Sequence, residues 1–303
     1  MNFSVTILGS SSALPTSDRF LTAQVLNVNE RFFLIDCGEG TQIQLRRCKI
    51  RFGSINHIFI SHLHGDHVFG LPGLLSSFNL LGRKNDLHIY SHKPLKQIIN
   101  QFLGQFFSIP EFNIVYHIID EYNTSMIYED KQVEVFSFPL KHRIPCSGFL
   151  FKEKKKLRSI KKDAIEFYNI PISEIIKIKK GWNYIDNQGN IIENSIITVD
   201  SSKPRSFAFV TDTEFLPEII PIISDVDLLY HESTYLSEET DLAKQTGHST
   251  VVEAARMANL AGASKLLLGH FSSRYKDCNL FYQQAKEIFP NVFIAEEGKT
   301  IQI

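Results

Sequence analysis

The sequence is poor in cysteine and carries almost no net charge. Its 303 residues include only four cysteines, and none of them lies in a C-x-x-C pair. Their spacing does not fit a disulfide framework, so we expect buried, reduced thiols in a cytoplasmic protein. The formal net charge of -1 gives no indication of a polyanionic partner.

The sequence also lacks the features of an exported or membrane-bound protein. The first residues, MNFSVTILGSSSALP, contain neither the basic region nor the long apolar region of a secretory signal peptide. No apolar run reaches the length of about 20 residues that a membrane-spanning helix needs. We therefore expect a cytoplasmic protein without a membrane partner.

Short apolar runs, many rich in β-branched residues, predict a series of strands. These runs are Phe3–Gly9, Arg31–Gly38, His57–His62, Leu87–His92, Val133–His142, Ser206–Asp212, Val226–Glu232, Lys265–His270 and Asn291–Gly298. Helical patterns lie at residues 68–82 and 250–263. In the second, Thr250 and Glu253 have capping-box spacing and Gly262 can end the helix. Strands mixed with helices in both halves predict an α/β protein whose helices cover its sheets.

One segment differs from the rest in charge. Between Phe151 and Lys180 there are ten Lys/Arg and four Asp/Glu, and apolar residues are sparse until Ile170. We interpret residues 151–185 as an insertion that leaves the core. Clustered lysines bind phosphates without reading sequence. On composition alone, however, a solvated surface helix explains the charge better, and this alternative stays open.

Histidine and aspartate are concentrated where predicted strands end. The stretch S-H-L-H-G-D-H at 61–67 follows one strand, and His142, Asp212 and His270 each end another. In α/β proteins functional groups collect at the carboxyl ends of strands. Seven N and O donors result, and such a set suits two Zn²⁺-like ions. They are His62, His64, Asp66, His67, His142, Asp212 and His270.

The spacing within this stretch has a physical reading. His62 and His64 are two residues apart, so they face the same side of an extended chain. Gly65 permits a sharp turn that directs Asp66 and His67 to a neighbouring point. In two-metal hydrolases the ions lie ~3.5–4 Å apart and activate water near neutral pH. Single histidines elsewhere in the chain are expected to be structural.

The H-x-H-x-D-H pattern resembles the metallo-β-lactamase fold superfamily, and further motifs resemble ribonuclease Z, the tRNA 3′-endonuclease family. These motifs are LGSSSALPTSDR (8–19), LIDCGEGTQIQLRR (34–47), ISHLHGDHVFGLPGLL (60–75), HESTY (231–235), GHSTVVEAA (247–255) and LLLGHFSSRY (267–275). They span nearly the whole chain. The resemblance implies a four-layer αβ/βα sandwich, a single domain over 1–303 with a flexible tRNA-binding arm inserted at 151–185.

The resemblance also implies a role for each site residue. One Zn²⁺ would be held by His62, His64 and His142, the other by Asp66, His67 and His270, with Asp212 bridging. Asp66 would also accept a proton from the attacking water. His248 matches the catalytic histidine of the family, and Glu232 matches the acidic residue that supports it. Two ions per chain are expected, as zinc or alternatively manganese.

The function implied is removal of the 3′ trailer from precursor tRNA, which leaves a 3′-hydroxyl on the tRNA and a 5′-phosphate on the trailer. Homodimers are common in the family. The arm residues expected to touch tRNA are Lys152, Lys154, Lys155, Lys156, Arg158, Lys161 and Lys162. Two features depart from many members: no adjacent Gly-Pro pair lies in the arm, and Phe20 rather than Asn follows Arg19.

Two other functions remain open at this point. One is a phosphodiesterase or other hydrolase of small substrates on the same fold, which would need no arm. The other is a metal-stabilised RNA-binding protein without catalysis. An intact ligand set beside Glu232 and His248 argues against the second, because binding alone requires no open two-metal site.

Overall fold

The computed structural model describes residues 2–106 and 110–303, which form two compact units. The first unit is built from the chain up to Glu129, from Glu134–Lys152 and from Arg205–Ile303. The second unit comprises Asp130–Val133 and Glu153–Pro204. The long second segment of this unit contains most of the basic stretch that the sequence singles out.

Two seven-stranded sheets form the centre of the first unit. The first sheet has the order β18-β1-β2-β3-β4-β5-β6. Its strands are β1 (Phe3–Gly9), β2 (Ala23–Val28), β3 (Arg31–Ile35), β4 (Ile55–Phe59), β5 (Leu87–Ser91), β6 (Ile114–Ile118) and β18 (Thr300–Gln302). Pairing is antiparallel from β18 to β3 and parallel from β3 to β6.

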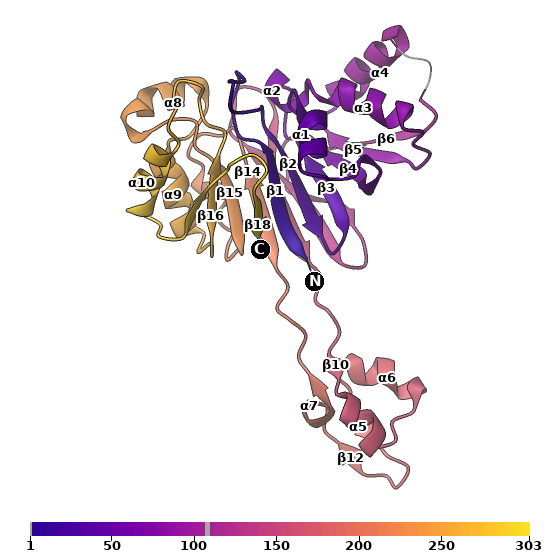
Figure 1. Ribbon diagram of the computed structural model, residues 1–303. Helices are drawn as coiled ribbons and strands as arrows, with labels where there is room; N and C mark the ends of the chain where they lie inside the picture. Colours follow the sequence, from indigo (N-terminus) through magenta and orange to yellow (C-terminus); the bar gives the residue numbers. More distant parts are fainter. Residues whose placement is uncertain (1, 107–109) are drawn as a thin grey trace. The chain divides into compact units, whose positions relative to one another are not determined.

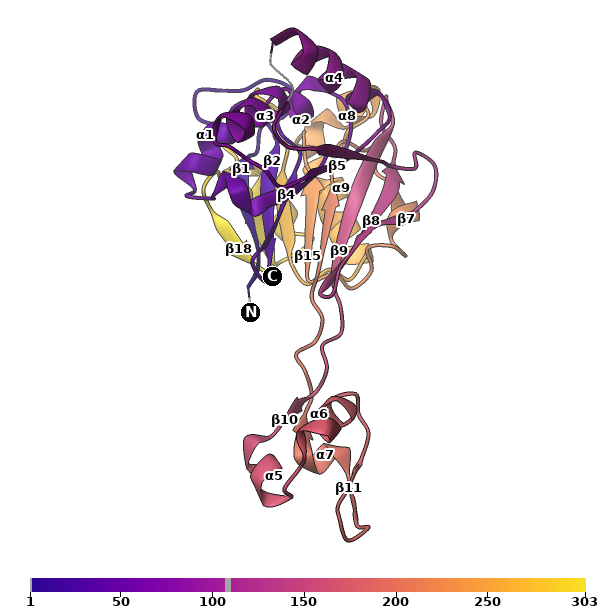
Figure 2. The ribbon, with the colours of Figure 1, turned by 90° about the vertical axis from the view of Figure 1, so that its right-hand side faces the viewer.

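The second sheet has the order β17-β16-β15-β14-β9-β8-β7. Its strands are β7 (Ser125–Glu129), β8 (Val133–Leu140), β9 (Cys146–Glu153), β14 (Ser206–Val210), β15 (Leu228–Glu232), β16 (Leu266–Gly269) and β17 (Val292–Ile294). The strands from β14 to β17 are parallel, whereas β9 pairs with β14 antiparallel. Figure 2 shows β9, β8 and β7 side by side along this sheet.

Helices cover the outer face of each sheet. Figure 1 shows α1, α3 and α4 beside the first sheet and α8, α9 and α10 beside the second. The helices of this unit are α1 (Thr41–Arg47), α2 (Gly65–Val68), α3 (Leu71–Leu80), α4 (Pro94–Phe106), α8 (Thr240–Thr246), α9 (Val251–Leu260) and α10 (Asn279–Lys286). Within residues 2–106 and 110–303 this unit also has three short 3-10 helices: η1 (Phe52–Ser54), η2 (Pro217–Ile219) and η3 (Ser237–Glu239). The four layers confirm the predicted sandwich.

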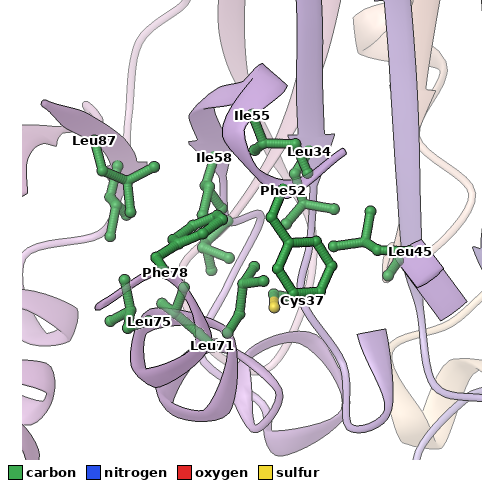
Figure 3. Close-up of a cluster of buried hydrophobic side chains, with 14 of the residues drawn as sticks. Leu34, Cys37, Leu45, Phe52, Ile55, Ile58, Leu71, Leu75, Phe78 and Leu87 are labelled. Carbon is green, nitrogen blue, oxygen red and sulfur yellow. The ribbon is translucent and has the colours of Figure 1, made fainter. Parts of the chain in front are cut away.

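Strand alternation explains how both faces of the first sheet are filled. Leu34 and Ile58 are register partners on β3 and β4, and both join the apolar cluster under α1 and α3. This cluster is drawn in Figure 3. Phe33 and Phe59 alternate with them and face the other sheet, where their rings lie 5.6 Å from Phe151 and 5.5 Å from Phe149 between centroids. Burying each such side chain contributes roughly 1.5–3 kcal/mol.

The predicted helix at 250–263 is confirmed with its signals in place. In α9 the Thr250 side chain accepts from the Glu253 backbone N–H, and the Glu253 carboxylate accepts from the Thr250 N–H. Gly262 follows with a φ of +63°, the left-handed conformation that glycine adopts most readily. Within 2–106 and 110–303, no helix is both long and apolar enough to cross a membrane.

The second unit has its own small core. Its elements are β10 (Ser159–Ile160), α5 (Lys162–Phe167), α6 (Ile172–Lys179), β11 (Tyr184–Ile185), β12 (Ile191–Ile192), α7 (Asn194–Ile197) and β13 (Thr198–Val199). Ile170, Ile178, Tyr184 and Ile197 are buried together at its centre. The unit is therefore a packed α+β fold of short elements rather than one charged helix.

Candidate metal centre

The metal-ligand stretch leaves β4 in extended backbone and then enters a single helical turn. His64 is the extended N-cap of α2, with φ -69° and ψ 150°. Gly65 opens α2, so the sharp turn predicted there is a change from extended to helical backbone and involves no left-handed residue. A Cβ at position 65 would lie 2.3 Å from the ring of Phe69, an exposed side chain that would have to move aside. The helical turn then places His67 beside the first pair, with its ring centroid 4.1 Å from that of His62.

Three histidines and one aspartate form a first group of donor atoms. His62, His64, His142 and Asp212 each offer one atom within 4.8 Å of the others. The imidazole of His64 is central: its Nδ1 lies 3.1 Å from His62 Nε2 and 3.2 Å from His142 Nε2. These side chains come from residues 150 apart in the sequence, which shows that the strand ends converge as expected.

A second group lies beside the first and shares Asp212 with it. Asp66, His67 and His270 again hold their donor atoms within 4.8 Å. Asp212 Oδ1 lies 3.2 Å from His270 Nε2 and 3.4 Å from His67 Nε2, whereas its Oδ2 lies 3.5 Å from His62 Nε2. The two oxygens of one carboxylate therefore face two different groups, as a bridging ligand requires.

The hydrogen bonds of the histidines test whether this donor set fits metal ions. His67 Nδ1 donates to Asp36 at 2.7 Å, His142 Nδ1 donates to the Gly247 carbonyl at 2.7 Å, and His270 Nδ1 is 2.9 Å from Thr234 Oγ1. Their outer nitrogens are fixed in this way while the inner nitrogens point at one another. Metal-ligating histidines show this arrangement, because the outer bond sets the tautomer. Burial lowers the pKa of His142, which favours the neutral ligand form. The donor set fits.

Three residues of the site have left-handed backbone one or two residues after a strand ends. The φ angles are +56° at Asp36, +35° at Asp212 and +60° at His270, after β3, β14 and β16. Such a conformation costs a non-glycine residue of order 1–3 kcal/mol and persists where the surroundings hold it. The two sheets supply that support, and the abrupt change of direction turns all three side chains into the site.

Glu232, which is buried, and His248, which is partly exposed, form a pair next to the two groups. Glu232 Oε1 accepts from His248 Nδ1 at 3.0 Å and from the Thr213 N–H at 2.8 Å. Burial lowers the pKa of His248, but the Glu232 charge and hydrogen bond outweigh it and raise the pKa to about 9. The raised pKa favours the protonated form of His248, which can donate a proton. Because Nδ1 is bonded to Glu232, Nε2 lies on the opposite edge of the ring. His248 is also close enough to Asp212 and His270 to count among possible ligands.

Two glycines let separate loops lie against each other under the site. A Cβ at Gly38 would lie 2.5 Å from the Asp66 carbonyl oxygen, and a Cβ at Gly70 would lie 2.0 Å from the Gly38 carbonyl oxygen. The Cys37 N–H also donates to the His67 carbonyl at 2.8 Å. The loop after β3 is therefore packed backbone to backbone on α2, and this contact fixes where Asp66 and His67 stand.

A cavity of about 650 Å³ opens onto these groups. Its lining includes the polar side chains of Asp66, Asp212, His248 and His270. Leu14 and Arg274 also line this cavity. The guanidinium carbon of Arg274 lies 5.2 Å from the centroid of the Tyr235 ring. Both donor groups and the His248–Glu232 pair thus serve a single solvent-accessible space.

Comparison with known proteins decides the family. The chain is 46% identical over 301 residues to ribonuclease Z of Bacteroides fragilis, covering 99% of both chains, and equally similar to that of Porphyromonas gingivalis. The chain belongs to the ribonuclease Z family. Human tRNase Z, short form, is 28% identical with a TM-score of 0.71 and 98% of both chains covered. A Bacillus subtilis metallo-β-lactamase fold protein has the same TM-score at 17% identity over all of both chains, a likeness of fold.

A family model described as anti-Pycsar protein Apyc1 matches residues 3–154. That match ends where β9 ends, at the start of the long segment of the second unit. The ribonuclease Z relatives, in contrast, match this chain from end to end. The predicted metallo-β-lactamase fold is confirmed, and the likeness to ribonuclease Z extends through the second unit.

Sequence reasoning missed the residues that orient the predicted ligands. Asp36 is buried and contacts His67, while its other oxygen accepts from the Ser61 N–H at 2.8 Å. Thr234 lies between Glu232 and His270, with Oγ1 2.5 Å from Glu232 Oε2. Both belong to quoted motifs, LIDCGEG and HEST, and Asp36 lies near the end of the predicted strand Arg31–Gly38, where a functional carboxylate could have been suspected.

The seven predicted tRNA-binding residues are not equivalent. Lys152 lies on β9 in the first unit, and the other six lie in the second. Arg158 donates to Thr198 Oγ1 at 2.7 Å and pairs with Asp200, while Lys161 donates to the Ile196 carbonyl at 2.6 Å. These contacts hold the unit together. Contact with tRNA stays a prediction for the whole set.

Proposed function

We propose that the chain is a zinc-dependent endoribonuclease that removes the 3′ trailer from precursor tRNA. Cleavage would leave a 3′-hydroxyl on the tRNA and a 5′-phosphate on the trailer. The observation that carries this proposal is the His248–Glu232 pair beside the seven-donor cluster, in one cavity, in a chain of the ribonuclease Z family. The names of the relatives support tRNA as the substrate.

Two Zn²⁺ ions would be held by the two donor groups. One ion would be held by His62, His64 and His142, and the other by Asp66, His67 and His270. Asp212 would contact both ions. When bound, such ions lower the pKa of water and stabilise negative charge on a phosphoryl group. Nitrogen and carboxylate donors without thiolate suit zinc, and manganese is the alternative.

The residues of the chain account for the proton transfers. Asp66 is the carboxylate that accepts a proton from the attacking water. Burial raises the pKa of this carboxyl, and its hydrogen bonds with His270 and His67 lower it. His248, held by Glu232, donates a proton to the leaving 3′-oxygen as the P–O3′ bond breaks. General acid and base groups of this kind contribute typically 10²–10⁴-fold each.

The direct test is cleavage of a precursor tRNA with an extended 3′ end. We expect the purified protein to release the trailer as one fragment with a 5′-phosphate, and to leave a tRNA that ends in a 3′-hydroxyl. Mapping both product ends checks this. Trailer nucleotides released one at a time, or a 3′-phosphate on the tRNA, would exclude the proposed reaction.

The second unit is proposed to bind tRNA, and its removal separates binding from chemistry. Lys152 and Ser206 are register partners on β9 and β14, so a short Asn-Gly turn can join these strands after deletion of 154–204. We expect the deletion variant to hydrolyse bis(p-nitrophenyl) phosphate at the parent rate. Its affinity for tRNA should fall, and the dependence of that affinity on salt should flatten, because fewer phosphates are neutralised.

Metal content gives the control for this deletion. A variant that keeps its metals and still binds tRNA as the parent does would show that the second unit is not the tRNA-binding element. Loss of both activities together with metal would mean that the first unit depends on the second for folding. The variant Lys155→Glu/Lys162→Glu, with both side chains exposed, then tests the charge without a deletion.

A homodimer in the cytoplasm completes the proposal, following the family resemblance. Sedimentation at micromolar concentration checks it, and only monomer would contradict it.

A further inference from the structure

The single tryptophan of the chain is exposed in the second unit. Trp182 has 66% of its surface in contact with solvent. Tryptophan is highly buried on average and enriched where partners bind, so an exposed indole is a candidate for contact with a partner. No step of the proposed reaction uses this residue.

The backbone that carries Trp182 is fixed although its side chain is exposed. Gly181, with φ +103°, turns the chain after α6, and the Trp182 N–H donates to the Lys177 carbonyl at 3.2 Å. The Trp182 carbonyl accepts from Asn194 Nδ2 at 2.7 Å, and this buried amide also donates to the Ile178 carbonyl at 2.7 Å. The indole therefore projects from an ordered turn, which lowers the entropy lost when it is contacted.

The neighbouring surface of α6 combines apolar and basic side chains. Ile172, Ile176 and Lys180 follow one another at intervals of four along one helix face, where the two isoleucines are largely exposed. Lys179 and Lys180 come directly before Gly181 and Trp182. Lys177 is paired with Glu174 at 2.8 Å and adds less to this charge.

We propose that Trp182 stacks on an unpaired or exposed base of the tRNA and so positions the substrate. An aromatic side chain next to cations is the usual platform for a nucleobase, because every base has a flat face and an adjacent phosphate. The positive charge beside the indole favours RNA over an apolar protein surface. This inference rests on the proposed function, since it names how that substrate is held.

Fluorescence and affinity of the full chain test the inference. Because Trp182 is the only tryptophan, precursor tRNA should quench the indole emission of the parent, whereas heparin, a polyanion without bases, should not. Trp182→Ala should weaken tRNA binding about 5- to 150-fold, the range for loss of one base–aromatic stack. Trp182→Phe should restore most of this affinity.

Other readouts distinguish stacking from charge or folding. In Trp182→Ala the KM for precursor tRNA should rise, with kcat on bis(p-nitrophenyl) phosphate and the salt dependence of tRNA binding unchanged, because no charge is removed. Tyr122→Ala is the matched control: Tyr122 is 82% exposed in the first unit but next to Asp120 and Glu121. This variant should bind tRNA as the parent does.

The contrary outcomes are separable. If the parent cleaves precursor tRNA and Trp182→Ala has the same KM, the stacking inference fails and the proposed function stands. Emission that changes with protein concentration alone places the indole against a second copy of the chain and also overturns the inference. A parent that neither binds nor cleaves precursor tRNA overturns both.

Discussion

Replacing His248 with alanine should lower kcat on precursor tRNA by about 10²–10⁴-fold, the range for loss of a general acid. Metal content should stay at the parent level, because His248 is assigned to proton transfer and not to a ligand role. The expectation follows from its hydrogen bond to buried Glu232, which holds the ring as a donor beside the cavity. Single-turnover cleavage and elemental analysis of the same preparation measure both quantities.

Substrates with different leaving groups sharpen this test. The p-nitrophenolate released from bis(p-nitrophenyl) phosphate departs without a proton, so His248→Ala should impair that substrate much less than tRNA. His142→Ala is the matched control, since its ring lies 5.0 Å from His248 between centroids but belongs to the first donor group. It should lose metal and both activities. Equal losses on both substrates for His248→Ala would contradict the acid role.

The isosteric change Asp66→Asn should lower kcat by at least ~10²-fold. Asparagine keeps the shape of the side chain but cannot accept the proton of the attacking water, and it is a weaker metal ligand. Asp66 Oδ2 lies 3.3 Å from His270 Nε2 and 3.4 Å from His67 Nε2. Turnover across a zinc titration, with metal content measured at each point, checks the expectation.

The zinc titration separates the two roles of Asp66. If excess zinc restores full metal content but not turnover, the carboxylate acts on the proton as proposed. Recovery of near-parental turnover at full metal content would show that Asp66 serves only as a ligand. Glu214→Gln provides a control carboxylate, because Glu214 pairs with Lys141 and does not belong to either donor group.

The strand pattern and the strand-end residues were predictable, because a buried strand leaves a clear signal in its own sequence. His142, Asp212 and His270 end such runs, and the structure brings them together. The strand β9 was missed over its whole length, and β2, β6, β7 and β18 were missed as well. Gly148 interrupts the apolar pattern of β9, and this residue is required because a Cβ there would lie 2.4 Å from the Phe138 ring.

Contacts between distant segments could not be predicted from local patterns. The hydrogen bond from His67 to Asp36 and the left-handed backbone at Asp36 depend on which strands become neighbours. The second unit is a further case. Its charge was evident, but its core of Ile170, Ile178, Tyr184 and Ile197 joins residues from several short elements with little periodicity of their own.

The backbone contact between the loop after β3 and α2 limits how this site can be re-engineered. A combinatorial library that randomises only residues 62–67 leaves the backbone at Gly38 unchanged. A variant that moves the Asp66 carbonyl oxygen toward Gly38 would then clash with that backbone. A library that allows alanine at Gly38 or Gly70 would contain inactive variants even when all seven predicted ligands are present, because the added Cβ clashes with a backbone oxygen. Diversification should therefore treat 36–40 and 62–70 as one block, designed together, although 21 residues separate them in the chain.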